Sequence, residues 1–271
     1  MILAALALAA AQVTPPAPVP ETEEGRAAAC QASVRRSPQE ALAIANRWQT
    51  SGGGLFARQC AGLAYVALGQ WTTAATVYEQ AAQEAERLND NSAPDFWVQA
   101  GNAWLAGGDT SKAVFAFDTA LASQNITPEL RGEARLDRAR ALVQENNLAA
   151  AREDLNRALE LVPADPMAWY LSAALALRQN ELPRARADIA RARQLANDNP
   201  EILLLAGTIA GRAGDMAEAE RIYRQVAGSA PDTDAGRAAA ASLATLRDVE
   251  VPAPAAQPGP TPAPAQQPQL R

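Results

Sequence analysis

Histidine is absent from all 271 residues of this chain. Without histidine there can be no histidine-based acid–base pair, no Ser-His-Asp triad and no histidine metal ligand. The stretch "SGGGLF" at 51–56 is rich in glycine, but no Lys-Ser or Lys-Thr pair follows it, so it does not fit a phosphate-binding loop. Glu153 and Asp154 lie beside Arg152 and Arg157, a pattern typical of a solvated helix face. We therefore predict a protein that is not an enzyme and that holds no cofactor or metal.

A surplus of basic residues is also missing. The chain has 24 Lys and Arg against 30 Asp and Glu, which gives a formal net charge of -6 at pH 7. Nucleic-acid-binding domains normally show the opposite balance, so the charge argues against a nucleic-acid partner. Aromatic residues make up only 5% of the chain, and few segments alternate in the way that strands do. An Ala-rich composition that is 48% hydrophobic instead indicates an all-α fold.

Long hydrophobic runs are limited to the first residues, "MILAALALAAAQ". This run is too short for a membrane-spanning helix, which needs ~20 apolar residues. It is similar to the hydrophobic part of a signal peptide over residues 1–11, with small residues for cleavage near Ala11, although it lacks a basic leader. The alternative is a disordered or buried N-terminal helix. Residues 12–21, which include "TPPAPVPE", form a Pro-rich spacer.

The C-terminal end, residues 249–271, is a second Pro-rich segment with seven prolines. Such a composition cannot form a packed core, so we expect a disordered tail that samples extended polyproline II conformations. Its ordinary interpretation is a solvated spacer, and the alternative is a docking motif for a partner domain. Just before it, "DAGRAAAASLATLRD" at 234–248 is typical of a polar-faced helix that caps a helical solenoid.

Between the two ends, three series of residues recur at the same spacings. Small residues are followed sixteen positions later by bulky ones. Within each series, successive members are 39, 38, 34 and 34 residues apart. The small series is Gly62, Gly101, Ala139, Ala173 and Gly207, and the bulky series is Tyr78, Phe117, Leu155, Ile189 and Tyr223. A second small series is Ala74, Ala113, Ala151, Ala185 and Ala219. Two helices can approach to roughly 8–10 Å only where small residues meet at the crossing, so the pattern predicts repeated helix pairs.

This pattern resembles the tetratricopeptide repeat, a pair of antiparallel helices with a large residue at position 4 and Pro at position 32. Trp97 and Trp169 match position 4, and Pro163 and Pro231 match position 32. The turn signals "GGD" (107–109), "ENN" (145–147) and "AGD" (213–215) fall between the two helices of their repeats. The pattern departs at Arg58 and Arg135, which hold position 4, and at Asn197, which replaces the expected Pro.

The resemblance implies a right-handed α-solenoid over residues 22–247, in which each repeat packs on its neighbours. A degenerate first repeat would cover 22–54, and five repeats would start near residues 55, 94, 132, 166 and 200. Asp165 and Pro166 predict a helix start, because an Asp side chain caps a helix and Pro suits its first turn. The surplus residues around 89–92 and 126–129 amount to about one helical turn, so they can lengthen the neighbouring helices. We expect Trp97, Trp104 and Trp169 to be packing residues.

The family also implies a function, because tetratricopeptide proteins present a concave face, lined by the first helix of each repeat, to peptides or partner proteins. The carboxylate clamp of the chaperone-binding members is not matched, apart from Asn102. An apolar row at position 5 and flanking polar positions predict a groove for a protein segment with apolar anchors. Its residues are Val98, Asn102, Leu136, Arg140, Tyr170, Arg178, Leu204 and Arg212. The alternative is that part of the row is core between repeats.

The two cysteines, Cys30 and Cys60, fall on neighbouring first helices of the implied repeats. An even number of cysteines in an exported chain favours a disulfide, because thiols oxidise in the periplasm and stay reduced in the cytosol. The alternative is two small buried residues that never meet. Together these features predict a non-catalytic interaction scaffold of the bacterial cell envelope, exported or periplasmic, with no integral membrane span. The alternative is a cytoplasmic adaptor with no signal peptide, and fractionation with an intact N-terminus separates the two.

Overall fold

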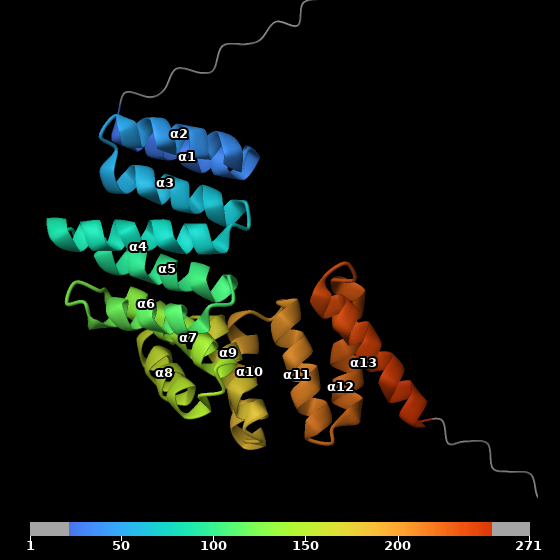
Figure 1. The fold of residues 1–271 in the computed structure, drawn as a ribbon. Helices are drawn as coiled ribbons and strands as arrows, with labels where there is room; N and C mark the ends of the chain where they lie inside the picture. The colour runs from blue at the N-terminus through green and yellow to red at the C-terminus, as the bar shows by residue number, and fades with distance from the viewer. Residues whose placement is uncertain (1–21, 251–271) are drawn as a thin grey trace, which may run out of the picture. The chain divides into compact units, whose positions relative to one another are not determined.

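The structure is a computed structural model that describes residues 22–250, with side chains described to residue 246. Within that range all regular structure is α-helical (Figure 1). The chain divides into two compact units, Met1–Leu161 and Val162–Arg271. The first unit contains α1 (Glu23–Arg36), α2 (Pro38–Thr50), α3 (Gly54–Ala67), α4 (Trp71–Leu88), α5 (Ala93–Ala106), α6 (Thr110–Ala122), α7 (Pro128–Gln144) and α8 (Leu148–Leu161). The second unit contains α9 (Pro166–Arg178), α10 (Leu182–Leu195), α11 (Pro200–Arg212), α12 (Met216–Ser229) and α13 (Asp234–Glu250).

Each repeat is an antiparallel helix pair, and most of the first helices begin close to the predicted positions. The first helices α3, α5, α9 and α11 start within one residue of the predicted 55, 94, 166 and 200. Helix α7 starts at Pro128, four residues before the predicted 132, because the surplus residues at 126–129 extend this helix at its N-terminus. Helix α4 takes up the other surplus and is the longest of the described helices, with 18 residues. The added turns leave the buried face of both helices in phase.

Short polar motifs start and stop these helices. The carboxylate of Asp165 accepts a hydrogen bond from the backbone N–H of Met167 at 2.8 Å, and Pro166 occupies the first turn of α9, as predicted. Between the helices of a pair, Gly108, Asn146 and Gly214 have φ values of 82°, 60° and 84°. Glycine and asparagine adopt this left-handed conformation at low cost, so the chain reverses within a few residues. The turn signals at 107–109, 145–147 and 213–215 are therefore confirmed.

The crossing of each helix pair is matched residue by residue. A Cβ added to Gly62 would lie 2.4 Å from the ring of Tyr78, and one added to Gly101 would lie 2.6 Å from the ring of Phe117. At Gly207 the corresponding distance, to Tyr223, is 2.7 Å. The two pairs with alanine at this position have an aliphatic residue opposite. These are Ala139 with Leu155 and Ala173 with Ile189, and all four are buried. Glycine thus occurs where the residue opposite is aromatic, because the aromatic ring occupies the space that a Cβ would need.

The first repeat, α1 and α2, is joined covalently to the next. Cys30 of α1 and Cys60 of α3 form a disulfide with their Cα atoms 5.9 Å apart, which confirms the predicted pairing. Both cysteines are buried in a small cluster with Ala45, Trp48 and Ala57. The disulfide therefore ties the least regular repeat to the body of the first unit.

One sequence-based interpretation is wrong. Asp154 on α8 was expected on a solvated face, but it is 1% exposed. Its carboxylate accepts hydrogen bonds from Arg138 Nη2 at 2.6 Å, Arg138 Nε at 2.7 Å and Arg135 Nη1 at 2.8 Å. Arg138 also pairs with Asp118 of α6. Arg135 holds the repeat position that is usually occupied by a large apolar residue, so this repeat has an ion pair in place of an apolar contact. The buried carboxylate of Asp154 requires such cationic partners. Glu153 is exposed, as expected.

The other repeat with arginine at this position is built in a similar way. Arg58 on α3 donates from Nε to Glu84 of α4 at 2.8 Å, and both side chains are partly buried. In the second unit, α13 packs against α12 and α11 and covers the last repeat, with Ala235 and Ala239 buried. The capping helix is therefore confirmed and continues to Glu250. The signal peptide and spacer predicted at 1–21 lie outside the described residues. Of the tail predicted at 249–271, residues 249 and 250 belong to α13, and the remainder lies outside the described residues.

Candidate partner-binding site

In the first unit, the predicted binding face is built by α5 and α7, and it is less open than expected. Val98 and Leu136 are each only 5% exposed, so they pack in the interior and offer a partner little surface. This agrees with the alternative that part of the apolar row is core between repeats. Asn102 is half-buried, and Arg140 is exposed with its guanidinium 3.0 Å from Asp137. The accessible part of this face is therefore polar.

In the second unit, the corresponding face of α9 and α11 keeps apolar surface open. Tyr170 and Leu204 are both half-buried and pack against the same hydrophobic cluster. Burial raises the pKa of the Tyr170 hydroxyl, and the negative charge of Glu201 raises it further, so the phenol stays neutral and can donate a hydrogen bond. Arg178 and Arg212 are exposed at the C-terminal ends of the two helices. This face combines two apolar anchors with positive charge.

The tryptophans expected to serve packing are held in place by carboxylates. Trp97 and Trp104 of α5 are buried, and their indole N–H groups donate to Glu86 and Glu79 of α4, each at 2.7 Å. The Nζ of Lys112 lies 4.1 Å from the centre of the Trp104 ring. Trp169 is partly buried and donates to the backbone carbonyl of Pro163 at 2.9 Å. Their packing role is confirmed.

Sequence reasoning missed an exposed aromatic residue on a second helix. Phe115 of α6 is 61% exposed, and its ring lies edge-on to Trp97 with the ring centres 6.2 Å apart. The buried residues Ala113 and Phe117 are each two positions away, and two helical positions correspond to ~200° of rotation. The spacing therefore already directed residue 115 outward, and a large aromatic residue there was the available signal.

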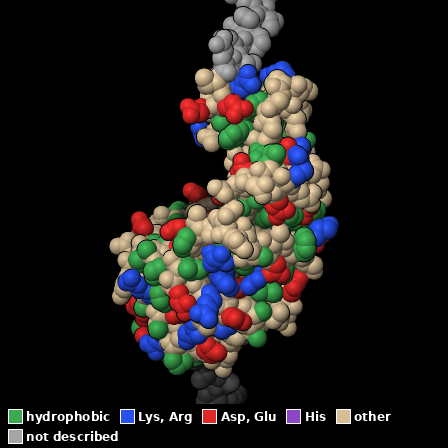
Figure 2. All heavy atoms as spheres, turned by 90° about the vertical axis from the view of Figure 1, so that its left-hand side faces the viewer, with side chains coloured by type: hydrophobic (Ala, Val, Ile, Leu, Met, Phe, Trp, Pro, Cys, Tyr) green, Lys and Arg blue, Asp and Glu red, His purple; other side chains and the backbone are tan. Residues whose placement is uncertain are grey.

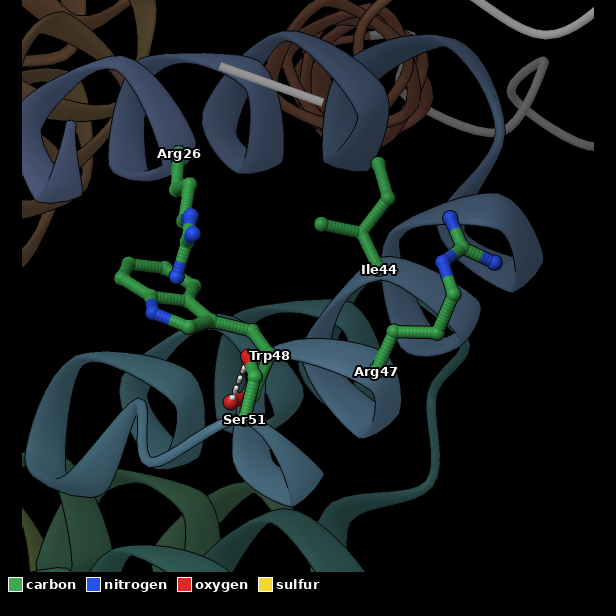
Figure 3. Close-up of a pocket in the computed structure, with 5 residues that line it drawn as sticks. All are labelled: Arg26, Ile44, Arg47, Trp48 and Ser51. Carbon is green, nitrogen blue, oxygen red and sulfur yellow. Dashed lines mark hydrogen bonds between the residues drawn. The ribbon is translucent and has the colours of Figure 1, made fainter. Parts of the chain in front are cut away.

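At least two hollows lie among the described residues of the first unit. One is an N-terminal notch of about 170 Å³, lined by Arg26, Ile44, Arg47, Trp48 and Ser51. Figure 3 shows Arg26 and Trp48 on one side of it and Ile44 and Arg47 on the other. In the described part of the chain, the indole N–H of Trp48 is a buried side-chain donor without a hydrogen-bond partner. The second hollow, of about 360 Å³, lies where the end of α4, the start of α5 and the end of α6 meet.

On one face of the molecule, exposed hydrophobic side chains are dispersed among charged ones (Figure 2). On the described residues of the face drawn in Figure 2, hydrophobic side chains are interspersed with Lys, Arg, Asp and Glu. Proteins that associate through a purely apolar interface expose larger continuous patches. A partner on this face would therefore meet charged and apolar groups together.

The described range lacks two kinds of feature. Over residues 22–250, no group of three or more His, Cys, Asp or Glu side chains is placed to hold a metal ion. In that same range no helix combines the length and hydropathy needed to cross a membrane.

Antiparallel helix pairs with matched crossings, stacked one after another along the chain, define a helical-repeat protein, a class whose members present extended binding surfaces to other proteins. A family model described as "Tetratricopeptide repeat" matches residues 61–126, 136–200 and 177–234. The chain belongs to the tetratricopeptide repeat family, whose members bind protein or peptide partners.

Solved structures with the same fold share little sequence with this chain. Pseudomonas aeruginosa PilF is 16% identical, with a TM-score of 0.65 over 81% of this chain and 97% of that chain. PilW, described as a widely conserved type IV pilus biogenesis factor, is 18% identical, with a TM-score of 0.67 over 80% of this chain and 98% of that chain. BtubC from P. vanneervenii is 17% identical, with a TM-score of 0.58 over 93% and 98%. These similarities show the fold alone. No curated protein sequence matches the chain.

Proposed function

We propose that this protein is a non-catalytic scaffold of the bacterial cell envelope that binds a segment of a partner protein on the face formed by its first helices. The observation that carries the proposal is the face of α9 and α11, where the half-buried Tyr170 and Leu204 lie on adjacent first helices that end in Arg178 and Arg212. A partner that covers half-buried aromatic and apolar side chains has to displace water only from their exposed parts. Central aromatic and arginine residues often dominate interface energies. An apolar segment that carries acidic residues fits this combination.

The envelope assignment is supported by the disulfide. Cys30 and Cys60 are both buried and bonded, and a structural disulfide of this kind persists in an oxidising compartment such as the periplasm. The hydrophobic start of the chain agrees with export. The alternative, a cytoplasmic adaptor, predicts two free thiols per chain. A thiol count on protein denatured directly from its native compartment distinguishes the two, because a cytosolic adaptor would react with two equivalents of a thiol reagent and an exported scaffold with none.

Arginine substitutions test the binding face more cleanly than a tyrosine substitution. Because Tyr170 is half-buried, its truncation would lower stability as well as binding. Arg178 and Arg212 are exposed, so Arg178→Ala/Arg212→Ala should leave thermal stability nearly unchanged. The matched control is Arg186→Ala/Arg191→Ala, which removes the same charge from exposed positions of the second helix α10.

The experiment is affinity capture from envelope extracts, followed by measurement of the affinity of the purified partner for each variant. We expect the Arg178→Ala/Arg212→Ala protein to bind its partner at least tenfold more weakly and the α10 control to bind as the wild type does. Equal affinities for wild type and both variants would mean that the partner docks elsewhere.

A further inference from the structure

Helix α10 differs from the other second helices in its charge. Its sequence, LPRARADIARARQL, contains four arginines and one aspartate, which gives a formal charge of +3 in a chain whose net charge is -6. The other second helices of the described repeats, α2, α4, α6, α8 and α12, are neutral or negative by the same count. Asp188 is buried, accepts a hydrogen bond from Ser172 and pairs with Arg184 at 3.4 Å, so it offsets the charge of that arginine alone.

The arginines of α10 form two rows along the exposed side of the helix. Residues seven positions apart lie within about 20° of one another around an α-helix. Arg186 and Arg193 therefore make one row, and Arg184 and Arg191 make the other. Uncharged, exposed residues lie between the rows. They are Pro183, Ala187, Ala190 and Gln194. The solvent face of α10 is thus a narrow, mostly apolar strip with guanidinium groups along both of its edges.

Little of the remaining positive charge is neutralised within the protein. Arg186 and Arg191 are exposed and take part in no ion pair with a described residue. The guanidinium of Arg191 donates instead to the neutral amide oxygen of Gln194 at 3.0 Å. Arg193 lies 3.9 Å from Glu218, but that carboxylate is already paired at 2.7 Å with an arginine of its own helix, α12. The solvent face of α10 therefore has positive charge available for an anionic partner.

We propose that the solvent face of α10 docks on a lipid bilayer that contains anionic headgroups. The lipid phosphates pair with the guanidinium groups of both rows, and the strip between the rows rests against the apolar boundary of the headgroup layer. Arginine suits this position, because its aliphatic stem can lie along apolar surface while its guanidinium reaches a phosphate. Each arginine held close to an anionic bilayer strengthens association roughly fivefold. The contact is peripheral, since α10 stays packed on α9 and α11.

A lipid surface fits this face better than a nucleic acid or an acidic protein does. Sites for nucleic acids and for protein segments place aromatic or other large anchors among their basic residues. The strip of α10 has no such anchor, because only proline, alanine and glutamine lie between its two rows of arginine. A bilayer needs none, because its headgroups are mobile and adapt to a smooth surface. The partner face proposed above belongs to the first helices α9 and α11, so the two sites share no residue.

The test is co-sedimentation of the full-length protein with phosphatidylcholine vesicles that contain phosphatidylglycerol as the anionic lipid. Vesicles of phosphatidylcholine alone measure binding that does not depend on charge, and we expect it to be at least tenfold weaker. Raising NaCl from about 0.1 M to about 0.5 M should release the protein from the anionic vesicles, because salt screens the attraction. Poly-L-glutamate at an equal concentration of negative charge should leave the protein on the vesicles, because it offers the strip no apolar boundary. Displacement would identify an acidic polypeptide as the ligand instead.

Three variants make the test specific to α10. Arg186→Ala/Arg191→Ala should bind anionic vesicles at least tenfold more weakly, because one arginine is lost from each row. The matched control, Arg35→Ala/Arg36→Ala, removes the same charge from exposed positions at the end of α1 and should bind as the wild type does. Ala190→Leu enlarges the apolar strip and should strengthen binding at least threefold. Circular dichroism of each variant checks that the helical fold is retained.

The outcomes separate this proposal from its alternatives and from the proposed function. It is overturned if neutral and anionic vesicles bind the protein equally, if the two double-arginine variants bind anionic vesicles equally, or if Ala190→Leu brings no gain. The α10 double variant should still bind the purified partner protein with wild-type affinity. A failure of vesicle binding therefore leaves the partner face untouched, and a failure of the partner face leaves the vesicle result standing.

Discussion

Gly101 of α5 provides a direct test of the matched helix crossings. A Cβ at this position would lie 2.6, 2.8 and 2.8 Å from three atoms of the Phe117 ring, about 1 Å closer than the ~3.5–4.0 Å at which carbon atoms pack. Phe117 is completely buried, so its ring can move away from an added Cβ only if neighbouring core residues shift as well. Overpacking of this kind costs about 1–3 kcal/mol. Alanine gains roughly 0.5–1 kcal/mol over glycine in a helix, and this offsets part of the cost. We expect Gly101→Ala to lower the free energy of unfolding by about 1–2 kcal/mol.

A second substitution should restore the crossing. Gly101→Ala/Phe117→Leu reproduces the pairing found at Ala139 and Leu155, which packs in the same unit. Phe117→Leu alone leaves a small void and should cost about 1 kcal/mol or more. Because alanine fills part of that void, the double variant should be more stable than the sum of the single effects predicts, with a coupling free energy of about 1 kcal/mol or more.

The assay is urea unfolding followed by circular dichroism at 222 nm, with equal m-values required before free energies are compared, since repeat proteins can depart from two-state behaviour. The control is Gly228→Ala in α12, where an added Cβ would meet no atom within 4 Å. It should raise stability by up to about 1 kcal/mol. If Gly101→Ala were as stabilising as Gly228→Ala, the explanation of the glycine positions would be refuted.

Two further substitutions test the covalent and ionic links of the first unit. Cys30→Ala/Cys60→Ala should lower the free energy of unfolding of the first repeat by roughly 3 kcal/mol, because the unfolded chain regains conformational entropy. The measurement is amide hydrogen exchange, which should become faster in α1 and α2. Unchanged exchange there would contradict a stabilising role. Asp154→Ala should cost about 3 kcal/mol or more, because it leaves Arg135 and Arg138 partly buried without their shared anion, whereas Glu153→Ala on the exposed face should stay within about 0.5 kcal/mol of wild type. Thermal unfolding of the two variants side by side measures the difference, and equal unfolding temperatures would show that the buried carboxylate adds no stability.

The repeat architecture could be predicted from the sequence because the crossing positions are local and periodic. Gly101 and Phe117 are sixteen residues apart in one chain segment, so their match is visible in the sequence, and so is the turn at Gly108 between them. The burial of Val98 and Leu136 could not be predicted in the same way. It depends on how closely one first helix packs on the next, and the repeat pattern does not encode that distance.

The burial of charged residues is the second feature that could not be predicted from the sequence. Asp154 follows Glu153 in a polar stretch. The helical period places residue 154 on the same side as the buried Ala151 and Leu155, but its charge led to the prediction of a solvated face. The burial results from Arg135, nineteen residues earlier, which occupies a position that is normally apolar and needs an anion. Once Arg135 was recognised as a departure from the repeat, a nearby buried carboxylate was the physical consequence to look for. The hollow beside Trp97 was missed because its lining residues come from the ends of helices, where the repeat pattern is weakest.

The disulfide between α1 and α3 also determines how the chain responds to mechanical tension. A force applied at the N-terminus passes from Cys30 to Cys60 through the covalent bond, so α2, which lies entirely between them in sequence, is bypassed. The sequence separation of 30 residues corresponds to roughly 100 Å of extended chain. That length is released only after reduction. Under oxidising conditions the segment between the two cysteines therefore does not lengthen under tension, and α2 is shielded from the applied force.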